Sequence, residues 1–117
     1  MEFKFDYDLE DDVLSVYNQD YKVKESIEFS EDIVLDLNES GKIIGIEIFY
    51  ASEFFSAQNK EINKDFLAKL SDAKLEYQDY RNMWFIIVFL KSSGKEVRQS
   101  MPPLRKSKYI SPLLLAD

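Results

Sequence analysis

Alternation of apolar and polar side chains at every second position dominates the first 50 residues of this 117-residue chain. Phe3, Phe5 and Tyr7 alternate with charged residues at the start. The same period recurs in residues 13–17, 23–29, 33–37 and 44–50. A period of two places successive side chains on opposite faces of a β-strand, whereas a helix needs apolar residues three or four apart. The pattern therefore predicts an antiparallel β-meander of about five half-buried strands.

The segment VLDLNESGKIIGIEIFYAS, residues 34–52, predicts a hairpin within this series. Gly41 closes its turn, because glycine adopts left-handed backbone angles without steric cost. Pairing Leu37 with Lys42 keeps the alternate isoleucines of the second strand on the buried face. A slip by one residue would turn those isoleucines outward, which a half-buried strand does not tolerate.

The same register predicts which hairpin residues face away from the core. It places Asp36 opposite Ile43, and it turns Glu47 outward, where we expect this carboxylate to accept from backbone N–H groups or to pair with a lysine. Gly45 lies on the same side as Glu47. The missing side chain there predicts a bulge or a closely packed neighbour.

The spacing of apolar residues changes after residue 52. Helical spacing connects Ile62, Phe66, Leu67 and Leu70. Asn63 is a plausible N-cap, because its side-chain oxygen can accept from a free backbone N–H of the first turn. We therefore predict a helical segment over residues 53–72, either continuous or interrupted near Gln58.

Strand patterns return in residues 73–100. Leu75 and Tyr77 alternate with polar residues, and every position from Met83 to Leu90 is apolar. A strand that is apolar on both faces is typical of a central position with cover on both sides. Prolines at 102, 103 and 112 predict an extended tail over residues 101–117. The chain is thus expected to be a single α+β domain over residues 1–117, with a meander (1–52), a helical segment (53–72), a second group of strands that includes a hairpin (73–100) and this tail.

The absence of cysteine and histidine narrows the chemistry that the chain can perform. It excludes disulfides, thiol nucleophiles and zinc sites of the Cys/His type, together with the most common general base. The acidic amino terminus lacks the basic and apolar pattern of an export signal, and the longest apolar run is far too short to span a bilayer. We therefore expect a cytoplasmic protein that needs no cofactor and does not contact a membrane.

Charge is distributed unevenly along the chain. Residues 1–58 carry 15 acidic and 4 basic side chains, whereas residues 91–117 carry 2 acidic and 6 basic ones. The net charge of −7 argues against nucleic-acid binding by the whole surface, because phosphate contacts need an excess of lysine and arginine. This separation of acidic and basic regions along the chain suits self-association or a charged protein partner, although both charged regions could also be solvated faces.

The first half resembles the family catalogued as domain of unknown function 2283. The matching elements are Y-D-x-E-x-D-x-L, then L-D, then G-K-I-x-G-I-E-I, and then A-S. The family-motif positions in this chain are Tyr7, Asp8, Glu10, Asp12, Asp36, Gly41, Gly45, Glu47 and Ser52. The resemblance implies a compact β-meander followed by a helix and no established activity. Some relatives look like neighbours of toxin genes, which suits an antitoxin-like or regulatory partner-binding role.

Several polar groups could carry chemistry, and each also has a structural interpretation. The run DYDLEDD crowds five carboxylates between Asp6 and Asp12, which could hold calcium or magnesium or form a solvated turn. Asp36 and Glu47 lie on neighbouring predicted strands and could act as an acid and base pair. Ser52 stands where strand gives way to helix, and a helix cap explains it fully.

These observations favour a non-enzymatic protein–protein interaction module that self-associates, most simply as a dimer. The aromatic content of 15% exceeds what a thin core needs. Possible interface residues are Trp84, Arg98, Tyr109, Leu113, Leu114 and Leu115. The alternative is a metal-dependent or carboxylate enzyme that uses the Asp6–Asp12 turn with Asp36 and Glu47. A third hypothesis is nucleic-acid binding by the basic tail.

Overall fold

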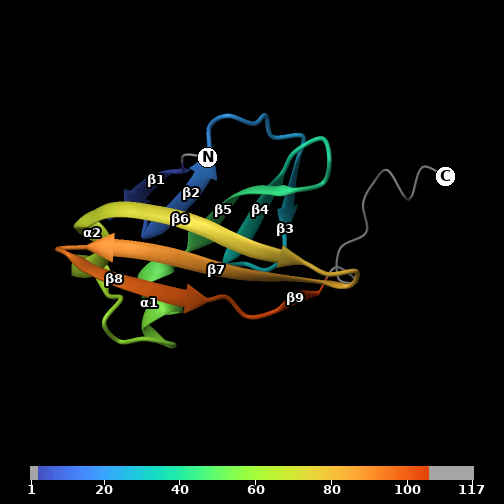
Figure 1. Cartoon of the computed structure of the whole chain (residues 1–117). Helices are drawn as coiled ribbons and strands as arrows, with labels where there is room; N and C mark the ends of the chain where they lie inside the picture. Colours follow the sequence, from blue (N-terminus) through green and yellow to red (C-terminus); the bar gives the residue numbers. More distant parts are fainter. Residues whose placement is uncertain (1–2, 106–117) are drawn as a thin grey trace.

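The computed structural model describes residues 3–105, which form two antiparallel β-sheets and two short helices (Figure 1). The first sheet contains β1 (Phe3–Asp8), β2 (Val13–Asn18), β3 (Glu25–Glu28), β4 (Ile33–Leu37) and β5 (Ile43–Phe49). The second contains β6 (Leu70–Asp79), β7 (Met83–Ser92), β8 (Lys95–Ser100) and the short β9 (Leu104–Arg105). The helices α1 (Ala51–Ser56) and α2 (Lys64–Ala68) connect the two sheets. This architecture confirms the expected α+β class, including the hairpins of the second half.

The strand order of the first sheet is β1-β2-β5-β4-β3. Each strand is antiparallel to its neighbours, as expected, but the chain does not pass from edge to edge in sequence order. Strand β5 returns to pair with β2 and therefore lies at the centre, with β3 at the edge. Its burial explains this position, because five of its seven residues are buried and a central strand offers the most cover.

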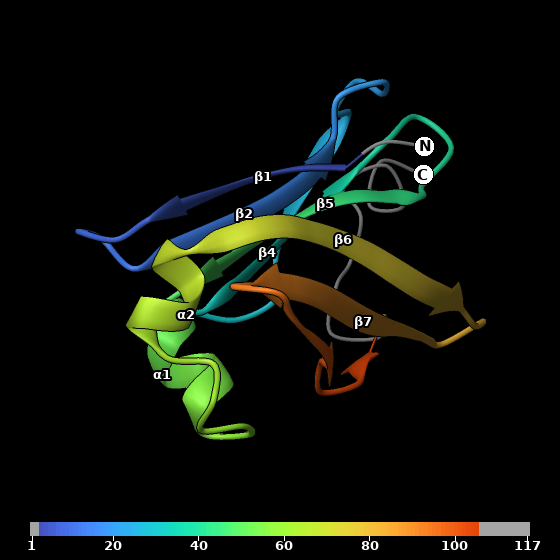
Figure 2. The same cartoon turned by 60° about the vertical axis from the view of Figure 1, so that its left-hand side comes forward.

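The second sheet packs across the first, with β6 against β1 and β2 (Figures 1 and 2). Strand β7 lies between β6 on one side and β8 and β9 on the other. The inward residues of both sheets and of the helical segment form one hydrophobic core, which includes Leu14, Ile48, Phe55, Leu75 and Val88. Both helices lie at the same end of the molecule (Figure 2).

The predicted alternation holds in most of the first half. Side chains of β1, β2 and β4 alternate between more and less exposed positions, as the sequence requires. The third strand is shorter than expected, since it begins at Glu25. Val23, the first apolar residue of the alternation predicted over residues 23–29, is instead 54% exposed in the loop before β3.

The β4–β5 hairpin confirms the turn and corrects the register. Gly41 has φ +77°, as predicted. Leu37 pairs with Ile43 rather than Lys42, and the next pair is Asp36 with Gly45, so Ile44 forms a β-bulge. Asn38 accounts for the difference. Its backbone N–H donates to the carbonyl of Lys42 at 2.9 Å, and its side-chain oxygen accepts from the Ser40 and Lys42 N–H groups, both at 3.0 Å.

The helical segment is broken more fully than predicted. Ile62 lies between α1 and α2, and Leu70 already begins β6. Asparagine side chains can hydrogen-bond to nearby backbone groups where a helix is interrupted or begins, and both Asn59 and Asn63 do so here. Asn59 accepts from the Glu61 N–H at 3.0 Å, whereas Asn63 caps α2, as expected, by accepting from the Phe66 N–H at 2.9 Å.

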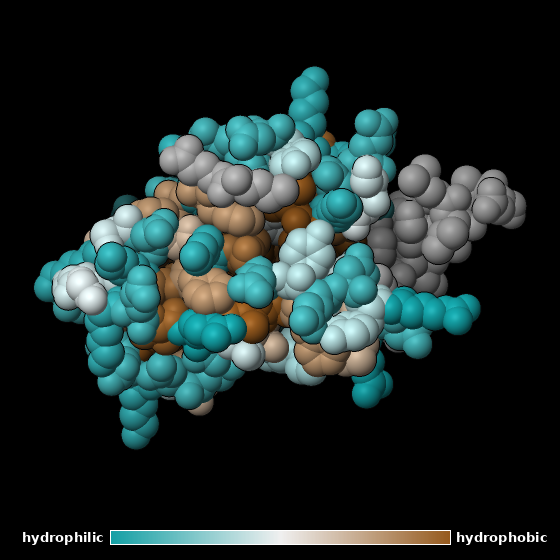
Figure 3. Space-filling model, in the orientation of Figure 1, coloured by the Kyte–Doolittle hydropathy of each residue, from teal (hydrophilic) through white to brown (hydrophobic). Residues whose placement is uncertain are grey.

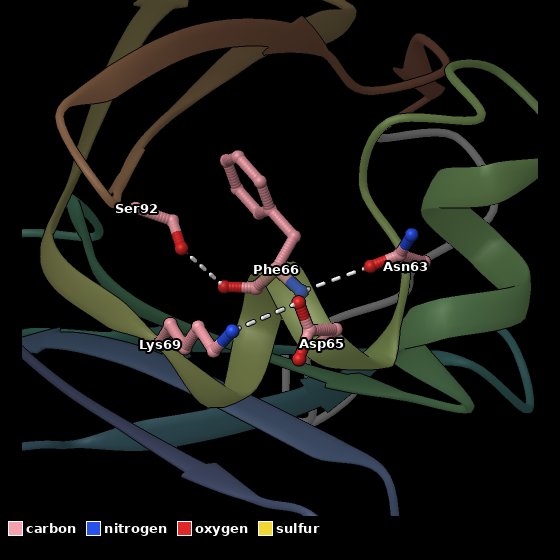
Figure 4. A network of polar contacts seen from close by, with 5 residues as sticks. All are labelled: Asn63, Asp65, Phe66, Lys69 and Ser92. Carbon is pink, nitrogen blue, oxygen red and sulfur yellow. Dashed lines mark hydrogen bonds and ion pairs between the residues drawn. The ribbon is translucent and has the colours of Figure 1, made fainter.

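A neutral hydrogen bond joins α2 to the end of β7 (Figure 4). The hydroxyl of Ser92 donates to the carbonyl of Phe66 at 2.7 Å, and Ser92 is only 2% exposed. On the solvent side of α2, Lys69 pairs with Asp65 at 3.2 Å. No helix within residues 3–105 combines the length and apolar character needed to cross a bilayer.

Candidate functional site

A buried carboxylate joins the β1–β2 turn to the start of α1. Asp12 lies in that turn and is 8% exposed. One of its carboxylate oxygens accepts from the hydroxyl of Tyr7 at 2.6 Å, and the other accepts from the hydroxyl of Ser52 at 2.7 Å. The backbone N–H of Ser52 points between them, at 3.0 and 3.2 Å. Three family-motif residues that lie up to 45 positions apart thus form one network, which we call the Asp12 network.

The hydrogen bonds of this network shift two pKa values in opposite directions. Burial alone would raise the pKa of Asp12, but the hydrogen bonds from Tyr7 and Ser52 favour the charged form and leave its pKa below the usual 3.8. Burial raises the pKa of Tyr7, and the adjacent Asp12 charge raises it further. Asp12 is therefore ionised and Tyr7 is protonated over the whole neutral range.

The same network holds two residues in left-handed backbone conformations. Asp12 has φ +57° and Tyr50 has φ +52°, a region that bulky side chains rarely adopt. The backbone carbonyl of Asp12 accepts from the Ala51 N–H at 2.9 Å. Asp12 thus satisfies two free N–H groups of the first turn of α1, those of Ala51 and Ser52, a capping role that we had assigned to Ser52. The N-cap position itself is Tyr50, whose side chain makes no capping bond.

The remaining acidic residues of the turn are separate from this network. Asp8 accepts from the Asp11 N–H at 3.0 Å, which shapes the turn, and Glu10 is exposed. In the described part of the chain, no group of three acidic residues is arranged to hold a metal ion. Since Asp12 already accepts from Tyr7 and Ser52, its carboxylate serves the fold.

Asp36 and Glu47 lie on the outer face of the first sheet, away from the core. The register places Asp36 opposite Gly45 and Glu47 opposite Val34, so the two carboxylates are diagonal neighbours. Asp36 accepts from the Ser26 hydroxyl at 2.6 Å. The partner that we expected for Glu47 is not found among residues 3–105.

Gly45 has the close neighbours that its position predicts. A Cβ atom at Gly45 would lie 3.2 Å from the Cβ of Tyr17 and 3.3 Å from a carboxylate oxygen of Asp36. Glycine therefore lets three adjacent strands approach without displacing either side chain. Its contribution is to packing on this face.

The outer face of the second sheet carries an apolar row along β7. Trp84, Ile86, Val88 and Leu90 point into the core. On the other side, Phe85 is 40% exposed and Ile87 and Phe89 are half-buried. The ring of Tyr80 contacts Phe85 edge to face at 5.3 Å. No further layer within residues 3–105 covers this face of the strand, although the sequence predicted cover on both faces. We call the row Phe85, Ile87 and Phe89 the β7 outer row.

Charged side chains flank the β7 outer row on both neighbouring strands. Lys74 of β6 and Arg98 of β8 pair in register with Phe89, and their charged groups lie 5.1 and 5.0 Å from its ring centre. These distances are typical of cation–π contacts. The space-filling view shows the result, with hydrophobic patches between hydrophilic side chains on the face of the second sheet (Figure 3).

The predicted interface residues fall into three groups. Trp84 is 5% exposed and contacts the ring of Phe29 edge to face at 5.4 Å, so it packs within the chain. Arg98 is exposed beside Phe89. The other predicted positions lie outside the described residues, namely Tyr109, Leu113, Leu114 and Leu115. The predicted interface residues did not include Phe85 and Phe89, because the apolar pattern of the strand indicated cover on both faces.

The positions in the Asp12 network and in the β4–β5 hairpin belong to a known sequence pattern. Residues 4–52 match the family model described as protein of unknown function (DUF2283). We call residues 4–52 the DUF2283 segment after this match. The match confirms the predicted resemblance and covers β1 to β5 and the first residues of α1, whereas the second sheet lies outside it.

Two curated relatives extend the match beyond the DUF2283 segment. An uncharacterised protein of Methanocaldococcus jannaschii is 37% identical over 67 residues, which are 57% of this chain and 57% of that protein. A Methanosarcina mazei protein, named provisionally as a hypoxanthine phosphoribosyltransferase, is 32% identical over 76 residues, which are 65% of this chain and 58% of that protein. The chain thus spans less than two thirds of either relative. No solved structure matches it significantly.

Proposed function

We propose that this protein is a non-enzymatic interaction module that self-associates through the β7 outer row. The observation that carries the proposal is the uncovered face of a central strand whose residues are apolar on both sides. Exposed apolar and aromatic side chains in one row, flanked by charges, are typical of protein–protein interfaces. Phe85 and Phe89 supply the aromatic anchors of the interface.

The charges beside the row favour a second copy as the occupant. Along β6 the outward side chains alternate in sign, from Asp72 through Lys74 to Glu76. Two copies can pack with these faces together and with their β7 strands antiparallel. The two-fold axis then crosses the β7 strands midway between Ile87 and Phe89. That arrangement places Lys74 of one copy opposite Glu76 of the other. A two-fold contact of this kind closes as a dimer.

Solution mass by light scattering tests this proposal on the full chain. We expect a dimer for the unmodified protein. Ile87→Glu should shift it to the monomer, because the proposed axis places Ile87 opposite Phe89 of the other copy and the new carboxylate would be buried in that apolar contact. Val23→Glu is the matched control, since Val23 is an exposed apolar side chain that lies away from this face, and it should leave the mass unchanged.

Charge reversal tests the proposed orientation. Lys74→Glu should weaken the dimer, and the added change Glu76→Lys should restore it, because the pair across the interface is then exchanged. A folded, monomeric wild-type protein at high concentration would overturn the proposal. A chain that becomes dimeric only after removal of residues 106–117 would contradict it too, since the cover would then come from the chain's own tail.

The enzymatic alternative has less support from the geometry. Asp12 is engaged by Tyr7 and Ser52, whereas Asp36 and Glu47 lie on the opposite side of the first sheet. The region shared with the Methanosarcina mazei relative is only 58% of that protein, so the similarity does not support the same activity for this chain. A different protein partner, bound in an antitoxin-like or regulatory role, would compete with the second copy of this chain for the β7 outer row.

A further inference from the structure

A cavity of about 340 Å³ opens between the two sheets, at the strand ends remote from the helices. Residues of the DUF2283 segment form most of its wall, and β6 closes the other side with Leu75 and Tyr77. Its volume lies at the lower end of the range for small-molecule sites. Phe3, Leu75 and the Ile43–Ile44 bulge supply an apolar lining. The cavity is separate from the β7 outer row.

A buried amide with an unused donor faces this cavity. Asn18 is only 4% exposed, and its side-chain oxygen accepts from the Asp20 N–H at 3.0 Å. Its amide nitrogen has no hydrogen-bond partner among residues 3–105, and it is not one of the fully enclosed nitrogens. Because Asn18 lines the cavity, this N–H₂ group is available to a ligand there. A nearly buried donor without a partner is unusual in folded proteins.

Two further donors share the cavity. The phenol oxygen of Tyr77 accepts from the Ile43 N–H at 3.2 Å, which leaves the phenol proton to donate. Burial raises the pKa of Tyr77, despite the opposing effect of the Ile43 bond, so the phenol keeps that proton at neutral pH. Lys42 lines the same cavity, and its ammonium forms no ion pair within the described range. An amide, a phenol and an ammonium in a cavity with apolar walls favour a ligand with an acceptor-rich head on an apolar body.

We propose that this cavity binds a small amphipathic organic acid, with its carboxylate held by Asn18, Lys42 and Tyr77. The apolar part of the acid packs against Phe3 and Leu75. An ammonium, an amide and a phenol can all donate charge-assisted hydrogen bonds to a carboxylate, which accepts at two oxygens. The DUF2283 segment thus contributes a ligand site and not only a scaffold.

Isothermal titration of the full-length protein with 4-phenylbutanoate tests the proposal, with 4-phenylbutanol as the neutral probe of similar shape. We expect the acid to bind and the alcohol to bind at least tenfold more weakly. Lys42→Met should weaken binding of the acid roughly fivefold or more and leave the alcohol unaffected. Lys24→Met is the matched control, because Lys24 lies at the same end of the molecule but does not line the cavity.

A second variant separates the site from a general charge effect. Ser40→Trp places a large ring at the rim, in an exposed turn position, and should block the acid without a change in melting temperature. Equal binding of acid and alcohol would overturn the proposal, as would the absence of binding by the wild-type protein. Equal weakening by Lys24→Met and Lys42→Met would overturn it too, since attraction would then come from the overall field.

Discussion

The two sheets of this protein are tied to their helices in different ways. In the first sheet, the ionised Asp12 accepts hydrogen bonds from Tyr7 and from Ser52 in α1. In the second, the neutral Ser92 hydroxyl donates to the Phe66 carbonyl in α2. Hydrogen bonds to a buried charge are worth about twice as much as neutral ones, and they are costlier to leave unmade. Three family-motif residues form the first connection, whereas the second lies outside the DUF2283 segment.

Removal of the carboxylate should produce the largest change. Asp12→Ala leaves the Tyr7 hydroxyl and both donors of Ser52 without their acceptor, inside a nearly closed site. It also places alanine at φ +57°, where aspartate is better tolerated. We expect a loss on the order of 3 kcal/mol in the free energy of unfolding, measured by urea denaturation.

The neighbouring residue provides the control for this substitution. Asp11 lies in the same turn but is exposed, so Asp11→Ala should change stability by less than about 0.5 kcal/mol. Similar losses for Asp11→Ala and Asp12→Ala would show that net charge in the turn, and not the Asp12 network, sets stability. Asp12→Asn should lie between the two, because an amide keeps one acceptor oxygen.

Two serines allow the sheets to be compared by the same substitution. Ser52 and Ser92 are both buried, and each hydroxyl donates at 2.7 Å, the first to a carboxylate and the second to a carbonyl. We expect Ser52→Ala to cost about 2 kcal/mol and Ser92→Ala about 1 kcal/mol. Chemical denaturation of both variants under one condition gives the comparison, with the exposed Ser100→Ala as the control. A larger loss for Ser92→Ala would mean that burial matters more here than the charge of the acceptor.

Local patterns predicted the elements of the fold that depend on neighbouring residues. The alternation of Phe3, Phe5 and Tyr7 indicated β1, and the φ value of Gly41 follows from the turn that it closes. Asn63 was identified as the cap of α2 from its place before an apolar helical pattern. Each of these features involves groups within a few positions of one another.

Features that depend on distant segments were missed. Strand β5 pairs with β2 as well as with β4, and the alternation of a strand does not reveal its second neighbour. The side-chain acceptor for the first turn of α1 comes from Asp12, 40 residues before Ser52. Acidic crowding around Asp12 suggested a solvated turn or a metal site, and only the folded backbone buries this one carboxylate. The open face of β7 was missed because an apolar strand does not indicate which element, if any, covers each side.

Acid titration should give the smallest effect, and it tests whether the charge of Asp12 itself stabilises the first sheet. The folded pKa of Asp12 lies below the usual 3.8, so the unfolded chain binds more protons between these two values. The stabilisation is complete above about pH 4 and is lost as the pH falls through the folded pKa. Urea denaturation of the wild type and Asp12→Asn from pH 7 to about pH 2.5 should therefore show a constant stability difference that narrows below pH 4, because asparagine does not titrate. A difference that stays constant to the lowest pH would assign the effect of Asp12 to its hydrogen-bond geometry alone, and the contrast between the charged and neutral connections would then disappear.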